Sequence, residues 1–168
     1  YTERDDVGIT GARLLYEDNT VQHAGVVIGY NGLAGHTFVG NEPDDVGYHA
    51  YVIQARDYSA VTAACLMVKA SLYDEVGGFE EELEVAFNDV DFCLKVREKG
   101  YLVVYNPYAV LYHYESKSRG YEDTPEKRNR FEKEAFFTYN KWEKILADGD
   151  PCYNPNLTLS NSDFSLRE

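Results

Sequence analysis

The sequence predicts an α/β fold in which a mixed sheet is flanked by helices and followed by a long helix and an irregular tail. The first observation is residues 61–69 (VTAACLMVK), a continuous apolar run of strand length that we expect at the centre of the sheet, covered on both faces. The second is residues 88–99, where apolar residues recur at helical spacing before Gly100. The third is Thr124-Pro125, an N-cap followed by proline, which opens a helix expected to run to about residue 147.

Two strands precede the central run. Residues 7–15 and 21–28 are apolar segments joined by the turn Glu17-Asp18-Asn19, and a β-hairpin is the simplest arrangement of them. Residues 29–48 follow, and their glycines and acidic stretch predict a loop rather than a regular element.

The remaining elements are short. Residues 71–76 predict a helix that Gly77 ends, residues 102–105 predict a strand, and residues 109–114 predict another strand after a corner at Pro107. Residues 148–168 are polar and turn-rich, so they predict an irregular tail. The long helix has one apolar stripe that we expect to be buried, formed by Phe131, Ala135, Thr138, Trp142 and Ile145.

Composition limits the class of protein. The 168 residues, of which 44% are hydrophobic, are expected to form a single domain over residues 1–168. The net charge of −13 repels phosphate backbones and argues against a nucleic-acid partner. No apolar run approaches the roughly 20 residues that span a bilayer, and the chain starts with neither a signal peptide nor Met. We therefore expect an excised fragment of a cytoplasmic protein.

The three cysteines have no C-x-x-C spacing, and any disulfide scheme leaves one of them unpaired. This pattern fits a reducing compartment such as the cytoplasm. Cys65 and Cys93 are expected to be small core residues.

A glycine turn that precedes acids at a helix start is the strongest candidate site. Gly77 and Gly78 can adopt φ > 0 and let a ligand approach the backbone; a helix C-cap also explains Gly77, although a cap needs only one glycine. Asn88 is a good N-cap, which would place Asp89 and Asp91 in the first helical turn. There, interaction with the helix dipole and a functional role are both open interpretations. The two carboxylates lie roughly 200° apart around the helix axis and cannot easily hold one metal ion.

Other acids and histidines have weaker support as site residues. Asp148 and Asp150 share the same spacing, but they follow a long helix and precede a proline, so we expect a solvated helix end. His23, His36 and His49 are isolated in the sequence, and we expect structural or surface roles for them.

Several motifs occur in a characteristic order. They are Thr62-Ala63-Ala64-Cys65, Gly77-Gly78-Phe79-Glu80-Glu81, Asn88-Asp89-Val90-Asp91-Phe92-Cys93-Leu94, Gly100-Tyr101 and His113-x-Glu115-Ser116-x-Ser118-Arg119-Gly120. Together they resemble the second half of family 2 glycosyltransferases, which have the GT-A fold. Gln22-His23-Ala24-Gly25 is similar to the segment that follows the nucleotide-sugar half, and residues 150–157 fit a bacterial polysaccharide branch. The resemblance covers nearly the whole chain.

The resemblance implies transfer of a hexosyl or deoxyhexosyl group from a nucleotide-sugar donor to a glycan or polysaccharide acceptor, with inversion. Asp89 matches the general base, His113 matches a histidine that helps hold a divalent Mn or Mg ion, and Arg119 could pair with the donor diphosphate. A structural histidine and a solvated loop arginine are the alternatives for the last two residues. Acceptor or sugar contacts are implied for Gly77, Gly78, Glu80, Glu81 and Asp91.

The chain also departs from the family pattern. Asn88 replaces a common glutamate, Ala63 replaces a common glycine, and the N-terminal nucleotide-binding half with its D-x-D motif has no counterpart. We therefore expect the full-length parent to act as the enzyme, at the inner face of the membrane or in the cytoplasm. For the isolated chain we expect inactivity, no bound cation and self-association through an uncovered sheet edge. The alternative is a non-catalytic acidic module that binds carbohydrate or protein.

Overall fold

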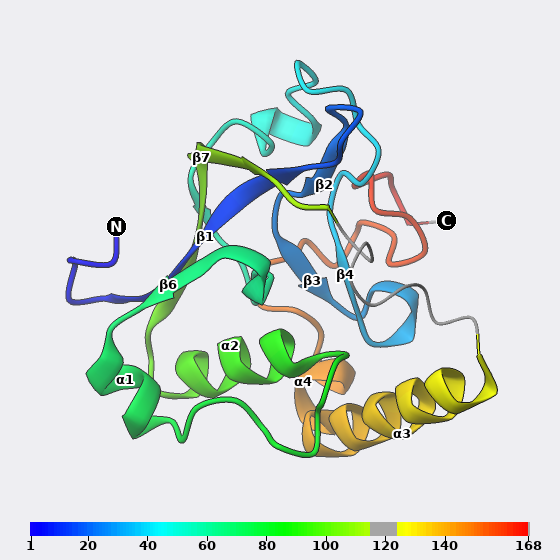
Figure 1. Cartoon of the computed structure of the whole chain (residues 1–168). Coiled ribbons are helices and arrows are strands. Elements are labelled where there is room, and N and C mark those ends of the chain that lie inside the picture. The colour runs from blue at the N-terminus through cyan, green and yellow to red at the C-terminus, as the bar shows by residue number, and fades with distance from the viewer. Residues whose placement is uncertain (115–123, 168) are drawn as a thin grey trace.

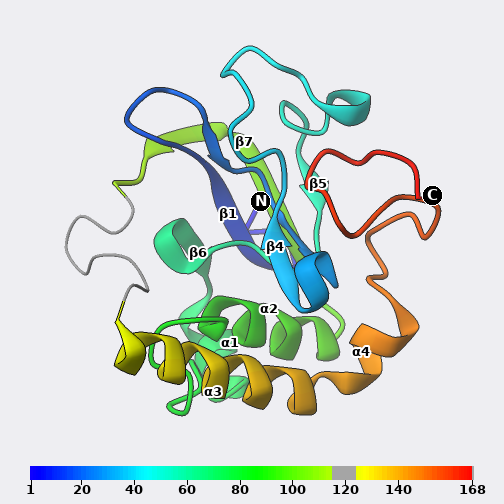
Figure 2. The ribbon, with the colours of Figure 1, turned by 90° about the vertical axis from the view of Figure 1, so that its right-hand side faces the viewer.

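The computed structural model describes residues 1–114 and 124–167 (Figure 1). A mixed five-stranded sheet has the strand order β2-β1-β7-β5, with β6 also paired to β1, and β3 and β4 form a separate two-stranded sheet. The four α-helices lie together on one side of the larger sheet, as both ribbon views show (Figure 2). The predicted α/β class, with a mixed sheet, flanking helices and a C-terminal helix, is confirmed. No helix of the described ranges is both long and apolar enough to cross a membrane.

Strand β1 (Val7–Leu15) is the centre of the sheet. It pairs in parallel with β7 (Leu102–Tyr112), and antiparallel with β2 (Val21–His23) and β6 (Leu66–Val68) on its other side. Eight of its nine residues are buried, and the ninth, Thr10, is half-buried. Close packing reaches its glycines as well, since a Cβ on Gly11 would lie 2.6 Å from Val61.

The expectation that residues 61–69 form the central strand is wrong. The side chain of Thr62 accepts a hydrogen bond from the amide of Ala64 and caps a 3-10 turn, η3 (Ala63–Cys65). Only three residues remain for β6, which lies at the sheet edge with Met67 63% exposed. An apolar run alone does not distinguish a buried strand from a capped turn followed by a short edge strand.

The hairpin of β1 and β2 is confirmed, but its second strand is shorter than predicted. The predicted strand is interrupted at Gly25, whose φ is 114°. The absence of a Cβ at this residue leaves room for the ring of Tyr58. Strand β3 (Val26–Ile28) then pairs with β4 (Ala34–His36). The predicted loop 29–48 therefore contains a strand and the 3-10 turn η1 (Tyr30–Gly32); η2 (Tyr48–Ala50) follows.

Strand β7 is continuous where two strands were predicted. Ala12 pairs with Asn106 and the next residue, Arg13, pairs with Val110, so a bulge around Pro107 takes the place of the predicted corner. The short strand β5 (Arg56–Asp57) pairs antiparallel with β7 at Tyr105 and Val104.

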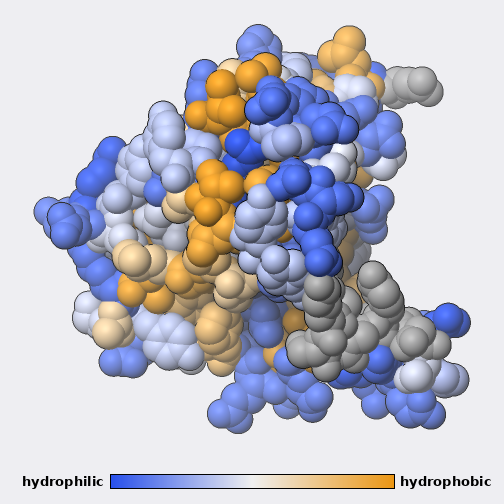
Figure 3. Space-filling view, turned by 45° about the horizontal axis from the view of Figure 1, so that its top comes forward, coloured by the Kyte–Doolittle hydropathy of each residue, from blue (hydrophilic) through white to orange (hydrophobic). Residues whose placement is uncertain are grey.

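The outer end of β7 is exposed. Among the described strands, β5 ends its pairing at Tyr105, so the edge opposite β1 has no partner beyond that residue. The exposed apolar side chains there are Tyr108 (77%), Val110 (49%), Leu111 (43%) and Tyr112 (51%). Figure 3 shows hydrophobic residues, in orange, gathered across the middle of one face of the molecule.

The helices are α1 (Ala70–Glu75), α2 (Asn88–Glu98), α3 (Pro125–Lys141) and α4 (Glu143–Asp148). Thr124 caps α3 as predicted, because its hydroxyl accepts a hydrogen bond from the amide of Lys127. The predicted long helix is divided at Trp142, whose φ of −113° leaves the helical region.

The buried stripe of α3 also differs from the prediction. Glu134 and Thr138 are buried together with Trp142, whereas Phe131 is 41% exposed. The tail after α4 is irregular as predicted, and Phe164 anchors it by stacking on Phe38 with ring centroids 4.8 Å apart.

Candidate functional site

Asp89 lies half-buried in the first turn of α2. Its Oδ1 accepts a hydrogen bond from the amide of Val90 at 2.9 Å, and its Oδ2 accepts one from the amide of Ala63 at 3.2 Å. The helix N-cap is Phe87, in the left-handed conformation with φ 61°, so the predicted N-cap role of Asn88 is wrong by one residue. Asp89 thus joins the start of α2 to the turn η3 and still keeps part of its carboxylate in contact with solvent.

Asp91 is fully buried and points toward α3 rather than toward η3. Its Oδ1 accepts a hydrogen bond from the indole Nε1 of Trp142 at 2.9 Å and contacts Lys141 Nζ at 2.8 Å, while Lys95 Nζ lies 3.4 Å from Oδ2. The two aspartates have separate partners, as their helical spacing predicts. A sugar contact was expected for Asp91, and this burial corrects it: the carboxylate is enclosed by the helix layer.

Gly77 and Gly78 form the C-terminal cap of α1. The amide of Gly78 donates to the carbonyl of Tyr73 at 2.9 Å and that of Gly77 donates to the carbonyl of Asp74 at 3.2 Å, the paired bonds of a Schellman motif. Both residues have positive φ, 80° and 65°. Packing also requires glycine at position 78, because a Cβ on Gly78 would lie 2.8 Å from the Tyr73 ring. The glycine pair is explained by the helix end, and its contact with a ligand stays a prediction.

Glu80 and Glu81 have different surroundings. Glu80 forms an ion pair with Lys141 Nζ at 2.8 Å, and this ammonium lowers the pKa of the carboxyl. Glu81 is exposed. A sugar contact by either residue stays a prediction, and Glu80 would have to share its carboxylate with Lys141.

His113 follows the last residue of β7. Its Nδ1 lies 2.9 Å from the side-chain Oε1 of Gln22, and its amide donates to the carbonyl of Leu15. Arg119, the predicted diphosphate ligand, lies outside the described residues. Among residues 1–114 and 124–167, no group of three or more His, Cys, Asp or Glu side chains is arranged to hold a metal ion.

Two histidines without a predicted site role lie close to His113. His23 is fully buried, and its ring lies 4.8 Å from that of His36, whose Nδ1 is 3.2 Å from the Gln22 carbonyl. Burial, followed by the charges of His36 and His113, holds the pKa of His23 well below its ordinary value. The pairing of β3 with β4 brings His36 here, and the only local signal was the polar pair Gln22-His23 inside an apolar strand.

One peptide segment connects His23 with Asp89. The amide of Thr62 donates to His23 Nε2 at 3.4 Å, and the next amide, of Ala63, donates to Asp89 Oδ2. Asp89 and the histidine cluster of His23, His36 and His113 therefore occupy neighbouring positions around η3.

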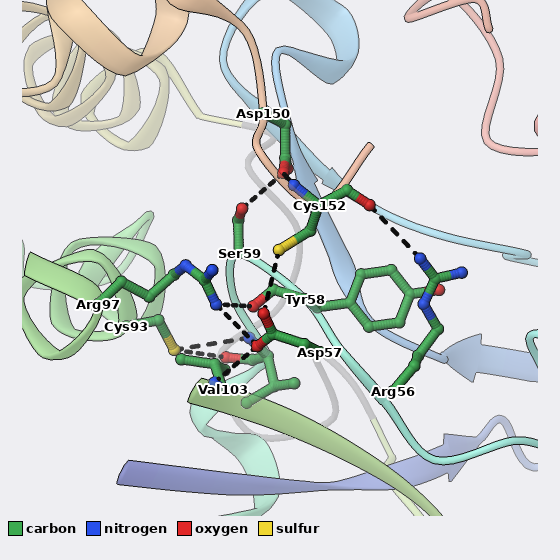
Figure 4. Close-up of polar contacts among 10 residues, drawn as sticks. Arg56, Asp57, Tyr58, Ser59, Cys93, Arg97, Val103, Asp150 and Cys152 are labelled. Carbon is green, nitrogen blue, oxygen red and sulfur yellow. Dashed lines mark hydrogen bonds and ion pairs between the residues drawn. The ribbon is translucent and has the colours of Figure 1, made fainter. Parts of the chain in front are cut away.

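A polar network beside this region fixes the chain after α4 to the sheet (Figure 4). Arg97 of α2 forms an ion pair with Asp57 of β5 at 2.7 Å and donates to the carbonyl of Tyr58. Asp57 also accepts a hydrogen bond from the amide of Val103 at 2.9 Å. The Cys152 thiol lies 3.4 Å from Asp57, and burial raises the pKa of that thiol to about 12.

Asp150 is an anchor of this network, which corrects the predicted solvated helix end at this residue. It is 9% exposed and accepts hydrogen bonds from Ser59 Oγ at 2.6 Å and from the amides of Cys152 and Ile28, both at 2.7 Å. All three cysteines are free thiols, and Cys93 is a core residue as predicted, with burial raising its pKa to about 12.

Comparison with known proteins shows two relatives along nearly the whole chain. An uncharacterized protein, y4gI, of Sinorhizobium fredii is 52% identical over 165 residues, 98% of this chain and 18% of its own length. The O-antigen biosynthesis protein RfbC of Myxococcus xanthus is 35% identical over 167 residues, again 98% of this chain but 13% of its own length. The chain thus spans less than a fifth of either relative.

A third relative matches a shorter segment. The N-acetylglucosaminyl-diphospho-decaprenol L-rhamnosyltransferase of Mycobacterium tuberculosis is 35% identical over 60 residues, 36% of this chain and 20% of that enzyme. No protein-family model matches the chain. The names of the second and third relatives indicate a glycosyltransferase-like relationship for this chain.

Proposed function

We propose that this chain is the acceptor-side, catalytic-base half of an inverting glycosyltransferase of family 2 with the GT-A fold. Its parent protein would transfer a sugar from a nucleotide-sugar donor to a glycan or polysaccharide acceptor of a bacterial cell envelope. The observation that carries this proposal is Asp89, a half-buried carboxylate held by two backbone amides at the position where the sequence motif places the base. The names of RfbC and the rhamnosyltransferase support the class of reaction.

Asp89 would take the proton of the acceptor hydroxyl, whose oxygen attacks the anomeric carbon on the face opposite the nucleotide. The bond from that carbon to the diphosphate oxygen breaks, and the nucleoside diphosphate leaves with the electron pair. A general base must be ionised at the working pH and lie within hydrogen-bond reach of the hydroxyl. The amides of Ala63 and Val90 fix the carboxylate without neutralising it, since each supplies one hydrogen bond and no charge. Inversion at the anomeric carbon follows from a single displacement.

His113 fits one position of a divalent-cation site in the parent protein. A metal-bound histidine commonly donates its other ring N–H to a carbonyl or carboxylate oxygen. Gln22 Oε1 lies 2.9 Å from Nδ1, so that contact would leave Nε2 for the ion. A bound Mn²⁺ or Mg²⁺ would offset negative charge on the donor diphosphate. Further ligands, the nucleotide contacts and the Arg119–diphosphate pair belong to parts of the parent outside the described residues.

The parent is proposed to act in the cytoplasm or at the inner face of the membrane. The three free thiols are typical of a reducing compartment. We propose that the isolated chain does not turn over, because residues 1–168 hold no counterpart of the nucleotide-binding strands that the resemblance associates with donor binding. The sugar contacts proposed for Gly77, Gly78, Glu80 and Glu81 complete the acceptor side of the site.

The test is sugar transfer by the parent polypeptide with Asp89→Asn. Loss of a general base is expected to lower kcat by about 10²- to 10⁴-fold with the fold intact. Asp74→Asn, on the exposed surface of α1, is the matched control and is expected to keep parental activity. Transfer by Asp89→Asn close to that of the parent would remove Asp89 as the base.

Stability measurements on the same variants distinguish catalysis from helix capping. A purely capping carboxylate stabilises by roughly 0.3–2 kcal/mol. If Asp89→Asn lowered the free energy of unfolding by this amount while transfer stayed intact, Asp89 would be a structural residue of a non-catalytic module.

A further inference from the structure

A hollow on the surface lies between α3 and the segment before α2. Its volume is about 910 Å³. One wall is a stripe of α3 at spacings i, i+4, i+7 and i+11, made of Asn129, Lys133, Phe136 and Asn140. The facing wall carries the exposed carboxylates of Glu82 and Glu84. Amides, carboxylates, the cations of Arg130, Lys133 and Lys141 and the rings of Phe136 and Phe137 therefore line the same space.

Phe136 is the aromatic centre of this wall. Its side chain is 70% exposed although it belongs to a helix whose opposite face packs on the core. Asn129 lies seven residues before it and Asn140 four residues after it, so an amide lies on each side of the ring along the helix. An apolar ring between hydrogen-bonding groups matches a sugar, which presents C–H groups on its face and hydroxyls around its rim.

Glu134 supplies a second, independent observation. This residue lines the hollow and is 3% exposed. Its Oε2 accepts a hydrogen bond from the amide of Ala86 at 2.6 Å, whereas its Oε1 has no hydrogen-bond donor and only a longer ion-pair contact, 3.4 Å, with Arg130 Nε. A buried carboxylate oxygen without a donor is costly. A hydroxyl group from a ligand in the hollow would supply that donor.

The segment that carries Glu82 and Glu84 leads along the chain to the start of α2. Phe87, the residue before that helix, packs its ring 5.5 Å from that of Phe131 on α3. The same segment is fixed to α3 by the bond from Ala86 to Glu134. Asp89 follows Phe87 by two residues, so one wall of the hollow leads directly to the proposed base.

We propose that this hollow binds a glycan, with one sugar ring stacked on Phe136 and its hydroxyls bonded to the amides and carboxylates around it. The identification of this glycan as the acceptor rests on the proposed function. The four carboxylates of the lining, of Glu82, Glu84, Glu126 and Glu134, lie beside three cations, of Arg130, Lys133 and Lys141, so their charges largely offset one another. The exposed Phe136 ring and the Asn129 and Asn140 amides assign the glycan to this hollow.

The experiment is a titration of the ¹⁵N-labelled chain with methyl glycosides of a hexose, a deoxyhexose and an N-acetylhexosamine, each up to about 50 mM, a range that detects millimolar Kd values. At least one glycoside is expected to give saturable shifts at residues of α3 and of the segment 82–86. Phe136→Ala is expected to weaken that binding about tenfold, since aromatic anchors carry much of the energy of such contacts. Glu84→Gln removes one rim carboxylate and is expected to weaken it by a smaller factor.

Tyr139→Ala is the matched control, because Tyr139 is a second exposed aromatic of α3, 48% exposed, that does not line the hollow. It is expected to keep the affinity of the parent chain. Equal losses in Tyr139→Ala and Phe136→Ala, or no saturable shift with any glycoside, would overturn the proposal. This titration measures binding without transfer, so its outcome is separate from the test of Asp89 as the base. A chain that binds no glycan in this hollow can still require Asp89 for transfer. A chain that binds a glycan here can equally well transfer sugar without Asp89.

Discussion

The carboxylate of Asp91 accepts a hydrogen bond from the indole of Trp142 at 2.9 Å, across 51 residues of sequence. Asp91 is fully buried, Trp142 is 8% exposed, and Lys141 Nζ lies 2.8 Å from the same oxygen. Trp142 is also the residue at which α3 ends and α4 begins. The buried carboxylate of Asp91 therefore attaches the first turn of α2 to the junction between α3 and α4, and Lys141 and Lys95 lie beside this carboxylate.

Neutralising Asp91 is expected to destabilise the chain. Asp91→Asn leaves Lys141 and Lys95 without their buried counter-charge, and loss of one partner of a buried ion pair costs about 3 kcal/mol. Urea denaturation of the chain measures this change. Glu75→Gln is the control, because its pair with Lys99 is about half exposed and is expected to contribute under about 1 kcal/mol. Similar costs for the two variants would show that Asp91 does not anchor the helix layer.

Much of the fold was predictable because its signals are local. Strand 7–15, the helix from residue 88 and the Thr124 cap depend on apolar spacing and on hydrogen bonds within a few residues. The failures are non-local. Whether residues 61–69 become a central strand depends on which segment fills the middle of the sheet, and β1 takes that place through its parallel pairing with β7.

In the candidate site, too, local features were predictable from the sequence and long-range contacts were not. The place of Asp89 in the first turn of α2 was predictable from the helical spacing, and its role as a base stays a prediction. The cluster of His23, His36 and His113, in contrast, exists only after β3 pairs with β4 and β7 ends beside Gln22. The burial of Asp91 depends on Trp142, which the sequence predicted to lie inside one continuous helix. A motif indicates which residues are special, and long-range packing decides which of them a ligand can reach.

Asp150→Ala is expected to cost about 4 kcal/mol. The substitution leaves three buried donors, from Ile28, Ser59 and Cys152, without their acceptor, and each unsatisfied group costs about 1–3 kcal/mol. The measurement is the midpoint and slope of urea denaturation. Asp148→Ala, two residues earlier and exposed, is the control and is expected to change stability by less than about 0.5 kcal/mol. If Asp150→Ala behaved like its control, the tail would not depend on this anchor.

The two glycines of the α1 cap are expected to differ in their tolerance of a Cβ. The Cβ added by Gly77→Ala has no atom within 4 Å. The substitution is expected to lower the free energy of unfolding by about 1 kcal/mol, because residue 77 has the left-handed conformation. Gly78→Ala adds contact with the Tyr73 ring at 2.8 Å, and that ring is held between Phe79 and Phe92. A total of about 2–3 kcal/mol is therefore expected for Gly78→Ala. Thermal unfolding of both variants checks the order, and equal costs would contradict the packing explanation.

Burial of His23 is expected to make stability depend on pH. The pKa of His23 is ordinary in the unfolded chain, about 6.5, and well below that value in the folded chain. Above pH 6.5 His23 is neutral in both the folded and the unfolded chain. As the pH falls below 6.5, the unfolded chain binds a proton at His23 that the folded chain does not bind. The free energy of unfolding therefore decreases, by up to about 1.4 kcal/mol per pH unit.

The check is the slope of unfolding free energy against pH, from pH 7.5 down to pH 5.5, in about 0.1 M salt without metal ions. His23→Gln is expected to flatten this slope even if it lowers stability at every pH. The groups facing His23 are the His36 and Tyr105 rings and the Thr62 amide, with His113 acting through its charge. His49→Gln, at an exposed position, should retain the parental slope, and an unchanged slope in His23→Gln would assign the dependence to other groups.

Self-association is expected through the outer end of β7. The edge of this strand has no described partner beyond Tyr105, and its exposed apolar side chains include Val110 and Leu111. Unpaired apolar edges favour pairing with another chain, and a lysine on such an edge opposes it because its charge would be desolvated. Sedimentation velocity over a concentration series should show dimers or larger species for the parent chain and a shift toward monomer for Val110→Lys. Val46→Lys, which adds the same charge at an equally exposed residue outside the strands, should associate like the parent. A parent chain that sediments as a monomer at every concentration would show that this edge does not drive association.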